Sequence, residues 1–154
     1  MALIQKIIHA LLVVQPPHPL FVHFPIALIC TALFFLLLAF WRKSDIFEKI
    51  AFANLCVAAV SILVAGFFGI RDNAVLFKGG APNHLAKIVI ASTLFIITSI
   101  TVFLRWRNPN LLQGRFKWLY LAVHFLLFAL VAVLGFLGGI IVYGFLSTAG
   151  LRIN

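Results

Sequence analysis

Apolar residues fall into four long blocks along the chain, and short polar stretches separate them. The blocks cover about residues 24–41, 50–70, 85–104 and 118–146. No Lys, Arg, Asp or Glu lies in the middle of a block, and Lys87 lies one turn inside the third. A bilayer core about 30 Å thick needs roughly 20 apolar residues per helix. The pattern therefore predicts four membrane-spanning helices.

The composition excludes a soluble domain. Hydrophobic residues make up 64% of the 154 residues and charged residues 10%, whereas soluble domains average about 45–50% and about 25%. The net charge of +9 is scattered between apolar blocks, so nucleic acid is not an expected partner. The prediction is an all-α integral membrane four-helix bundle of up-and-down topology, which forms one domain over residues 16–154.

The first fifteen residues, MALIQKIIHALLVVQ, form a separate amphipathic segment. Its apolar stretch is too short to span a bilayer, and it lacks the cleavage site and the charged start of a signal peptide. We expect a short interfacial helix, which Pro16 and Pro17 end because proline cannot continue a helix.

The three tryptophans indicate the bundle's orientation. Trp41, Trp106 and Trp118 fall on one side of an up-and-down bundle, as expected at the headgroup level. This tryptophan end carries seven Lys or Arg against five at the other end. An excess of basic residues marks the cytoplasmic side, so both termini are expected outside. The seven are Arg42, Lys43, Lys49, Arg105, Arg107, Arg115 and Lys117; the five are Lys6, Arg71, Lys78, Lys87 and Arg152.

Polar side chains inside the predicted spans gather one to two turns from the tryptophan end. They are Asn54, Thr98 or Thr101, and His124. An unpaired polar group in hydrocarbon costs several kcal/mol, so these side chains should face one another. Either a structural cluster or a contact to a ligand such as a quinone accounts for them.

Small residues within the spans suggest close helix packing. Gly66 and Gly69 lie on the second span, and residues 135–139 of the fourth form a GxxxG pattern. Such residues allow helices to approach closely, although a flat ligand or a homodimer contact would use them too.

Cys30 and Cys56 lie ~14 Å apart in depth, too far for a disulfide.

The richest chemistry lies at the opposite end, here called the histidine end. His18, His23 and His84 are all placed there, with Asp72 at the end of the second span. Imidazole ligates haem iron, zinc or copper, and ionisable groups in membrane bundles are functional by default. Haem or metal ligation, helix capping and proton transfer are the alternatives. His124, in the other leaflet, has no histidine partner, so one bis-histidine haem is the maximum.

Two prolines shape the expected geometry at this end. Pro19 disfavours helical geometry at His18, and Pro25 suits the first turn of a helix. We therefore expect His23 just before the first span, with both histidines held in a stiff loop and not on one helix face.

The motif HPLFVHFP at residues 18–25 resembles the signature of a widespread bacterial family of small predicted four-helix membrane proteins of unknown function. The glycine-to-aspartate pattern at residues 65–72, His84 and the glycine-rich stretch 138–144 resemble further features of that family. The resemblance implies a compact four-helix membrane domain in the bacterial inner membrane. Clustered histidines in this family have suggested haem or metal binding. Relatives carry His-Gly soon after the fourth-helix tyrosine, whereas Phe145 and Leu146 follow here, which weakens the haem interpretation.

Three functions compete. The first is electron transfer at the periplasmic face through one haem b, or a metal, bound by His18, His23 and His84, with Asp72 beside them. The second is a non-catalytic scaffold or accessory subunit in which the same residues are structural. A transporter ranks last, because the span centres carry only residues such as Ser61, Ser92 and Thr93. No P-loop, GxSxG, HExxH or CxxC motif occurs. The expected partners are the lipid bilayer and either a second copy or a redox protein.

Overall fold

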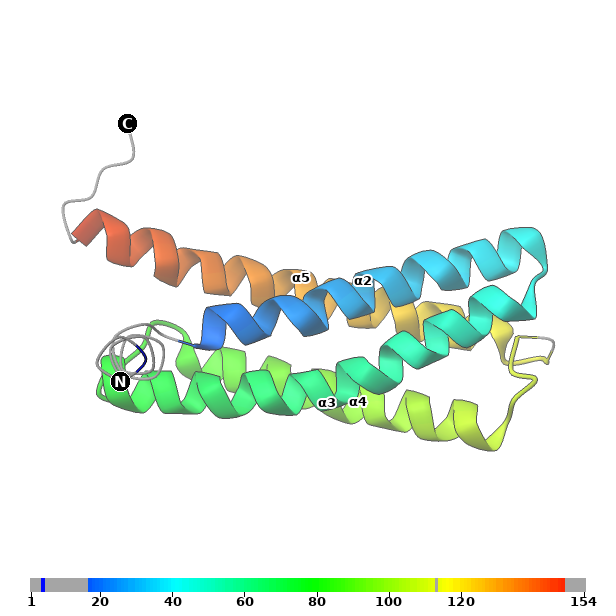
Figure 1. The fold of residues 1–154 in the computed structure, drawn as a ribbon, viewed down its shortest axis with the longest axis horizontal. Helices are drawn as coiled ribbons and strands as arrows, with labels where there is room; N and C mark the ends of the chain where they lie inside the picture. The colour runs from blue at the N-terminus through cyan, green and yellow to red at the C-terminus, as the bar shows by residue number, and fades with distance from the viewer. Residues whose placement is uncertain (1–3, 5–16, 113, 149–154) are drawn as a thin grey trace.

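The computed structural model describes Ile4 and residues 17–112 and 114–148, with side chains as far as Ile140. Four helices follow one another in antiparallel order: α2 (His18–Arg42), α3 (Asp45–Leu76), α4 (His84–Arg107) and α5 (Lys117–Thr148) (Figure 1). All four are long and apolar enough to cross a membrane. The predicted all-α four-helix architecture is confirmed. The expected interfacial helix over residues 1–15 falls outside the described part of the chain.

The start of α2 corrects the sequence-based expectation. The helix begins at His18, not near residue 24, so His18 and His23 both lie within it and not in a loop. Pro19 occupies the first helical turn, where a backbone N–H has no intrahelical acceptor and its loss costs nothing. Pro25 lies inside the helix and is buried. The restriction that Pro19 places on His18 is outweighed by contacts that His18 makes with α3.

Helix α3 also exceeds its predicted span, because it continues from residue 70 to Leu76. Asp72 is therefore a buried helical residue and not part of the connection. The α3–α4 connection is only residues 77–83, and it turns through positive φ angles at Lys78, Gly79 and Asn83. The side-chain oxygen of Asn73 accepts a hydrogen bond of 3.0 Å from the Ala81 N–H, which holds the connection against the end of α3.

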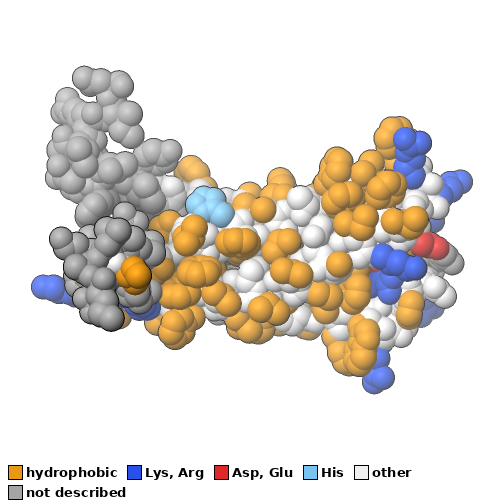
Figure 2. All heavy atoms as spheres, viewed as in Figure 1, with side chains coloured by type: hydrophobic (Ala, Val, Ile, Leu, Met, Phe, Trp, Pro, Cys, Tyr) orange, Lys and Arg blue, Asp and Glu red, His pale blue; other side chains and the backbone are white. Residues whose placement is uncertain are grey.

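The interior of the bundle is apolar along most of its length. Alanines are fully buried where α2 meets α3, the most extensive helix contact, because small side chains let backbones approach closely. Outward-facing side chains are also apolar, and Figure 2 shows them over the middle of the molecule. This pattern suits a protein whose exterior contacts lipid. The main core comprises Ile29, Ala32, Leu55, Ala58, Ile62, Leu94, Leu127 and Val131.

The predicted tryptophan end is present as a physical end of the bundle. Trp41 closes α2, Trp106 lies in the last turn of α4, and Trp118 lies in the first turn of α5. All three side chains are exposed. In the face drawn in Figure 2, most of the visible Lys and Arg side chains gather at the end where α2 passes into α3. Exposed indoles beside basic residues are typical of a headgroup region.

The small residues and cysteines have different surroundings. Gly135 faces α2, where a Cβ atom would lie 3.8 Å from Ile26 Cδ1. At Gly66 and Gly138 a Cβ atom would meet nothing within 4 Å. Close packing therefore explains Gly135 but not these two. Cys30 and Cys56 are both free thiols, as predicted.

Candidate functional site

His18 joins the start of α2 to the last turns of α3. Its backbone N–H donates to Asp72 Oδ2 at 3.0 Å, and its ring Nδ1 lies 2.9 Å from the Ala65 carbonyl oxygen. A carbonyl oxygen only accepts, so Nδ1 carries the proton. The ring covers Gly69, where a Cβ atom would lie 3.0 Å from both Cε1 and Nδ1 of His18. We call this arrangement of His18, Ala65, Gly69 and Asp72 the histidine contact.

Asp72 serves α2 as a capping residue supplied by another helix. Pro17, at the N-cap of α2, makes no side-chain hydrogen bond to the helix. The first N–H groups of a helix lack intrahelical acceptors and carry partial positive charge. The buried Asp72 carboxylate accepts from the His18 N–H, and Arg71 Nη1 lies 3.0 Å from its other oxygen. The carboxylate is thus satisfied from two helices.

The other two predicted site residues do not take part in this contact. His23 is exposed, and its Nδ1 donates to the carbonyl of Pro19 in its own helix. It lies five residues after His18, which is ~140° around the helix. His84 opens α4, is half-buried, and donates from Nδ1 to the Ala81 carbonyl at 2.9 Å. Two of the four predicted residues, His18 and Asp72, are therefore in direct contact.

The protonation pattern bears on haem or metal binding. In His18, His23 and His84 the Nδ1 atom donates to a backbone carbonyl, so Nε2 carries the lone pair. Ligating histidines in proteins show this arrangement. Within residues 17–112 and 114–140, however, no three His, Cys, Asp or Glu side chains form a group that could hold a metal ion. Each imidazole fits a ligand role singly, although a group of three such ligands is not formed among the described residues.

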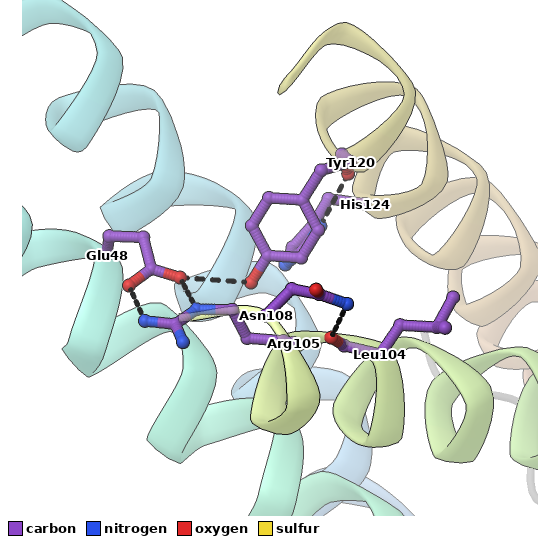
Figure 3. Close-up of polar contacts among 6 residues, drawn as sticks. All are labelled: Glu48, Leu104, Arg105, Asn108, Tyr120 and His124. Carbon is purple, nitrogen blue, oxygen red and sulfur yellow. Dashed lines mark hydrogen bonds and ion pairs between the residues drawn. The ribbon is translucent and has the colours of Figure 1, made fainter. Parts of the chain in front are cut away.

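A second polar cluster lies at the tryptophan end, inside the bundle (Figure 3). Arg105 of α4 donates through Nε and Nη2 to the two carboxylate oxygens of Glu48 on α3. The Tyr120 hydroxyl of α5 lies 3.4 Å from Glu48 Oε1. Glu48 is 3% exposed and Arg105 is 6% exposed. We call these three residues the tryptophan-end cluster; they connect three helices through one ion pair and one weaker hydrogen bond.

The predicted polar layer of Asn54, Thr98 or Thr101, and His124 is a separate set of side chains. Thr101 Oγ1 donates to the Ile97 carbonyl of its own helix at 2.7 Å, and His124 Nδ1 donates to the Tyr120 carbonyl at 2.9 Å. Asn54 is half-buried. No direct hydrogen bond joins these side chains to one another in the described part of the chain. The Thr101 hydroxyl and His124 Nδ1 instead donate to backbone carbonyls on the preceding turn of their own helices.

Sequence reasoning missed Glu48 and Arg105 as partners. Arg105 was counted among the cations that mark the membrane surface, and Glu48 lies before the second predicted span. One signal was available: both residues lie at the tryptophan end of consecutive antiparallel spans, at the same level in the membrane. A carboxylate and a guanidinium at one level of neighbouring helices favour pairing.

An open groove also lies at the tryptophan end, in the connection between α4 and α5. Its volume is about 340 Å³. No predicted site residue contributes to it. Its lining residues are Arg107, Asn108, Pro109, Asn110, Leu111, Gly114 and Phe116.

Four spanning helices with an apolar exterior define a multi-pass membrane protein. The chain belongs to the family described as "Predicted membrane protein (DUF2231)", whose model matches residues 14–148. The match includes both polar clusters and confirms the resemblance to a membrane family of unknown function. No curated protein and no solved structure matches the chain.

Proposed function

We propose that this protein is a non-catalytic membrane module, a scaffold or accessory subunit, in which the histidine contact fixes the bundle. The observation that carries this proposal is the position of His18. Its ring lies against Gly69, and its Nδ1–H and backbone N–H both bind α3. A side chain held by these contacts joins two helices. Its ring then has little freedom to move toward a ligand or substrate.

The physical role of the contact supports this function. Apolar helices gain no hydrophobic stabilisation from each other within lipid, so packing and hydrogen bonds drive their association. A hydrogen bond to a charged group contributes about 1.5–3 kcal/mol, and the His18 N–H donates to the Asp72 carboxylate. The second polar cluster connects α3, α4 and α5 at the other end. Both ends of the bundle are thus fixed by polar contacts.

The setting we propose is the bacterial inner membrane, with the tryptophan end in the cytoplasm and both termini in the periplasm. The support is the family resemblance and the seven basic residues at the tryptophan end against five at the other, since an excess of Lys and Arg marks the cytoplasmic side. The partner of such a module is a second copy or another membrane subunit. Apolar side chains on the outer faces of all four helices offer surface for such a partner.

A comparison of two histidines on the same helix tests the proposal. His18→Ala should lower the midpoint of thermal unfolding in detergent, because it removes the ring contact and the bond to Ala65. His23→Ala is the matched control, because His23 is exposed and bonds only within its own helix, and it should leave the midpoint unchanged. Equal midpoints for the two variants would contradict the structural role of His18.

Binding of haem b or a metal, with electron transfer, is the second candidate function. The favouring observation is that His18, His23 and His84 all present Nε2 as the basic nitrogen. A bound haem would supply one-electron redox chemistry. The exposed His23 and half-buried His84 would be its ligands, while His18 and Asp72 would support the end of α2.

A reduced-minus-oxidised absorption spectrum with metal analysis, on protein from haem-supplied cells, tests this candidate. Sharp Soret and α bands near one haem per chain, lost in His23→Ala or His84→Ala, would establish it. A flat spectrum with no metal would exclude it and leave the scaffold proposal. The unfolding midpoints of the same variants keep loss of haem separate from loss of fold.

A further inference from the structure

Two buried polar atoms lie inside the bundle without a hydrogen-bond partner among the described residues. They are Oγ1 of Thr98 on α4 and Nε2 of His124 on α5. Thr98 is 0% exposed and His124 is 1% exposed. Buried polar groups in proteins are nearly always paired, and the exceptions call for an explanation such as a water, an ion or a functional role.

Helix geometry places the two atoms at similar depth. Thr98 is seven residues from Arg105 along α4, or ~10 Å, and His124 is four residues from Tyr120 along α5, or ~6 Å. Arg105 and Tyr120 both contact Glu48, so they lie at one level. The difference in depth between Thr98 and His124 is therefore ~4 Å. Both lie on the inner side of the tryptophan-end cluster.

The hydrogen-bonding capacity of the two atoms defines what could bind them. His124 Nδ1 donates to the Tyr120 carbonyl, so Nε2 is an acceptor that needs a donor. The Thr98 hydroxyl can donate and accept. Leu94 and Leu127, about one turn away from Thr98 and His124 on the same helices, belong to the apolar core. A very small molecule with an O–H donor and an acceptor oxygen satisfies both atoms, and water is such a molecule.

We propose that Thr98 and His124 together hold one internal water molecule within the membrane-spanning bundle. The water donates one hydrogen to His124 Nε2. Its other hydrogen or its oxygen bonds to Thr98 Oγ1. Buried waters typically make two to four such bonds to otherwise unsatisfied groups. The site is separate from the histidine contact and does not depend on the scaffold proposal. It extends the tryptophan-end cluster into a polar column ~10 Å deep.

A double-mutant cycle tests the bridge. Thr98→Val keeps the shape of the side chain and removes the hydroxyl. His124→Asn keeps a donor near the position of Nδ1 and removes Nε2. If the water bridges the two, Thr98→Val lowers the unfolding midpoint by about 2–4 °C but has little further effect in the His124→Asn background. If the hydroxyl is simply unpaired, Thr98→Val raises the midpoint in both backgrounds, and the proposal is overturned.

Thr101→Val is the matched control. Thr101 lies on the same helix, is also buried, and donates to the Ile97 carbonyl. Its effect should be the same in the wild-type and His124→Asn backgrounds. Equal coupling of Thr98 and Thr101 to His124 would overturn the proposal.

A direct measurement complements the cycle. An experimental map of the full chain at better than about 2 Å should show a solvent peak within hydrogen-bonding distance of both atoms. A map without that peak, or with a direct bond from Thr98 to His124, would overturn the proposal.

Discussion

Gly69 is the residue on which the histidine contact depends most closely. A Cβ atom there would lie 3.0 Å from two atoms of the His18 ring, so Gly69→Ala must displace the ring or separate α2 from α3. We expect a loss of about 1–3 kcal/mol in the free energy of unfolding, measured by chemical denaturation in mixed micelles.

Gly66→Ala provides the control on the same helix, three residues away. Nothing lies within 4 Å of a Cβ atom at Gly66, and alanine favours helix over glycine by about 1 kcal/mol. This variant should match or exceed the wild type in stability. A similar loss in both alanine variants would show that glycine is needed for another reason than the ring.

Arg105 and Arg107 have the same side chain, two residues apart, in different surroundings. Arg105 is buried against Glu48, whereas Arg107 is exposed above the ring of Phe103. Arg105→Gln leaves a buried carboxylate without its cation, which costs about 3–5 kcal/mol. Arg107→Gln should cost less than about 1 kcal/mol. Unfolding free energies of the two variants, measured side by side, check this difference; equal losses would contradict the burial of the Glu48 pair.

At the scale of the helix, Asp72 determines how stable the first turn of α2 is. Asp72→Ala removes the acceptor of the His18 N–H and should release the first turn of α2. Hydrogen–deuterium exchange should then quicken in peptides from the start of α2. Exchange at the start of α4 should not change, because His84 is bonded to Ala81 in the connection just before α4. Unchanged exchange at α2 would contradict the capping role of Asp72.

The existence of the four helices follows from the apolar blocks, but their ends do not. Hydropathy marks what lies in lipid, while the start of α2 and the end of α3 each continue nearly two turns beyond it, because His18 and Asp72 satisfy each other. The proline rules placed His18 in a loop, since they describe local preferences and contain no term for a contact 54 residues away. Tertiary contact decided the end of the helix.

The candidate site was partly predictable for the same reason. Topology alone placed His18 and Asp72 at one end, and the structure brings them together. Whether His23 takes part in this contact depends on its angle around α2. That angle can be derived only when the true start of the helix is known. The pairing of Glu48 with Arg105 could not be derived from hydropathy, because hydropathy does not give the direction of a side chain at a span end.

At the scale of the whole molecule, the charge distribution predicts orientation. Single cysteines introduced at Asn110 and at Lys78, with Cys30 and Cys56 replaced by alanine, report opposite ends of the bundle. A membrane-impermeant thiol reagent applied from the periplasmic side should label the cysteine at position 78 and not that at 110. Labelling of position 110 alone would reverse the proposed topology.

The central claim is that His18 is a structural contact of the bundle, and the cost of Gly69→Ala in two backgrounds tests it most directly. In the wild-type background the new methyl group meets the His18 ring and lowers the free energy of unfolding. In the His18→Ala background the ring is absent, so the same substitution should cost nothing or stabilise the helix. An equal cost in both backgrounds would contradict the account, because Gly69 would then be required independently of His18.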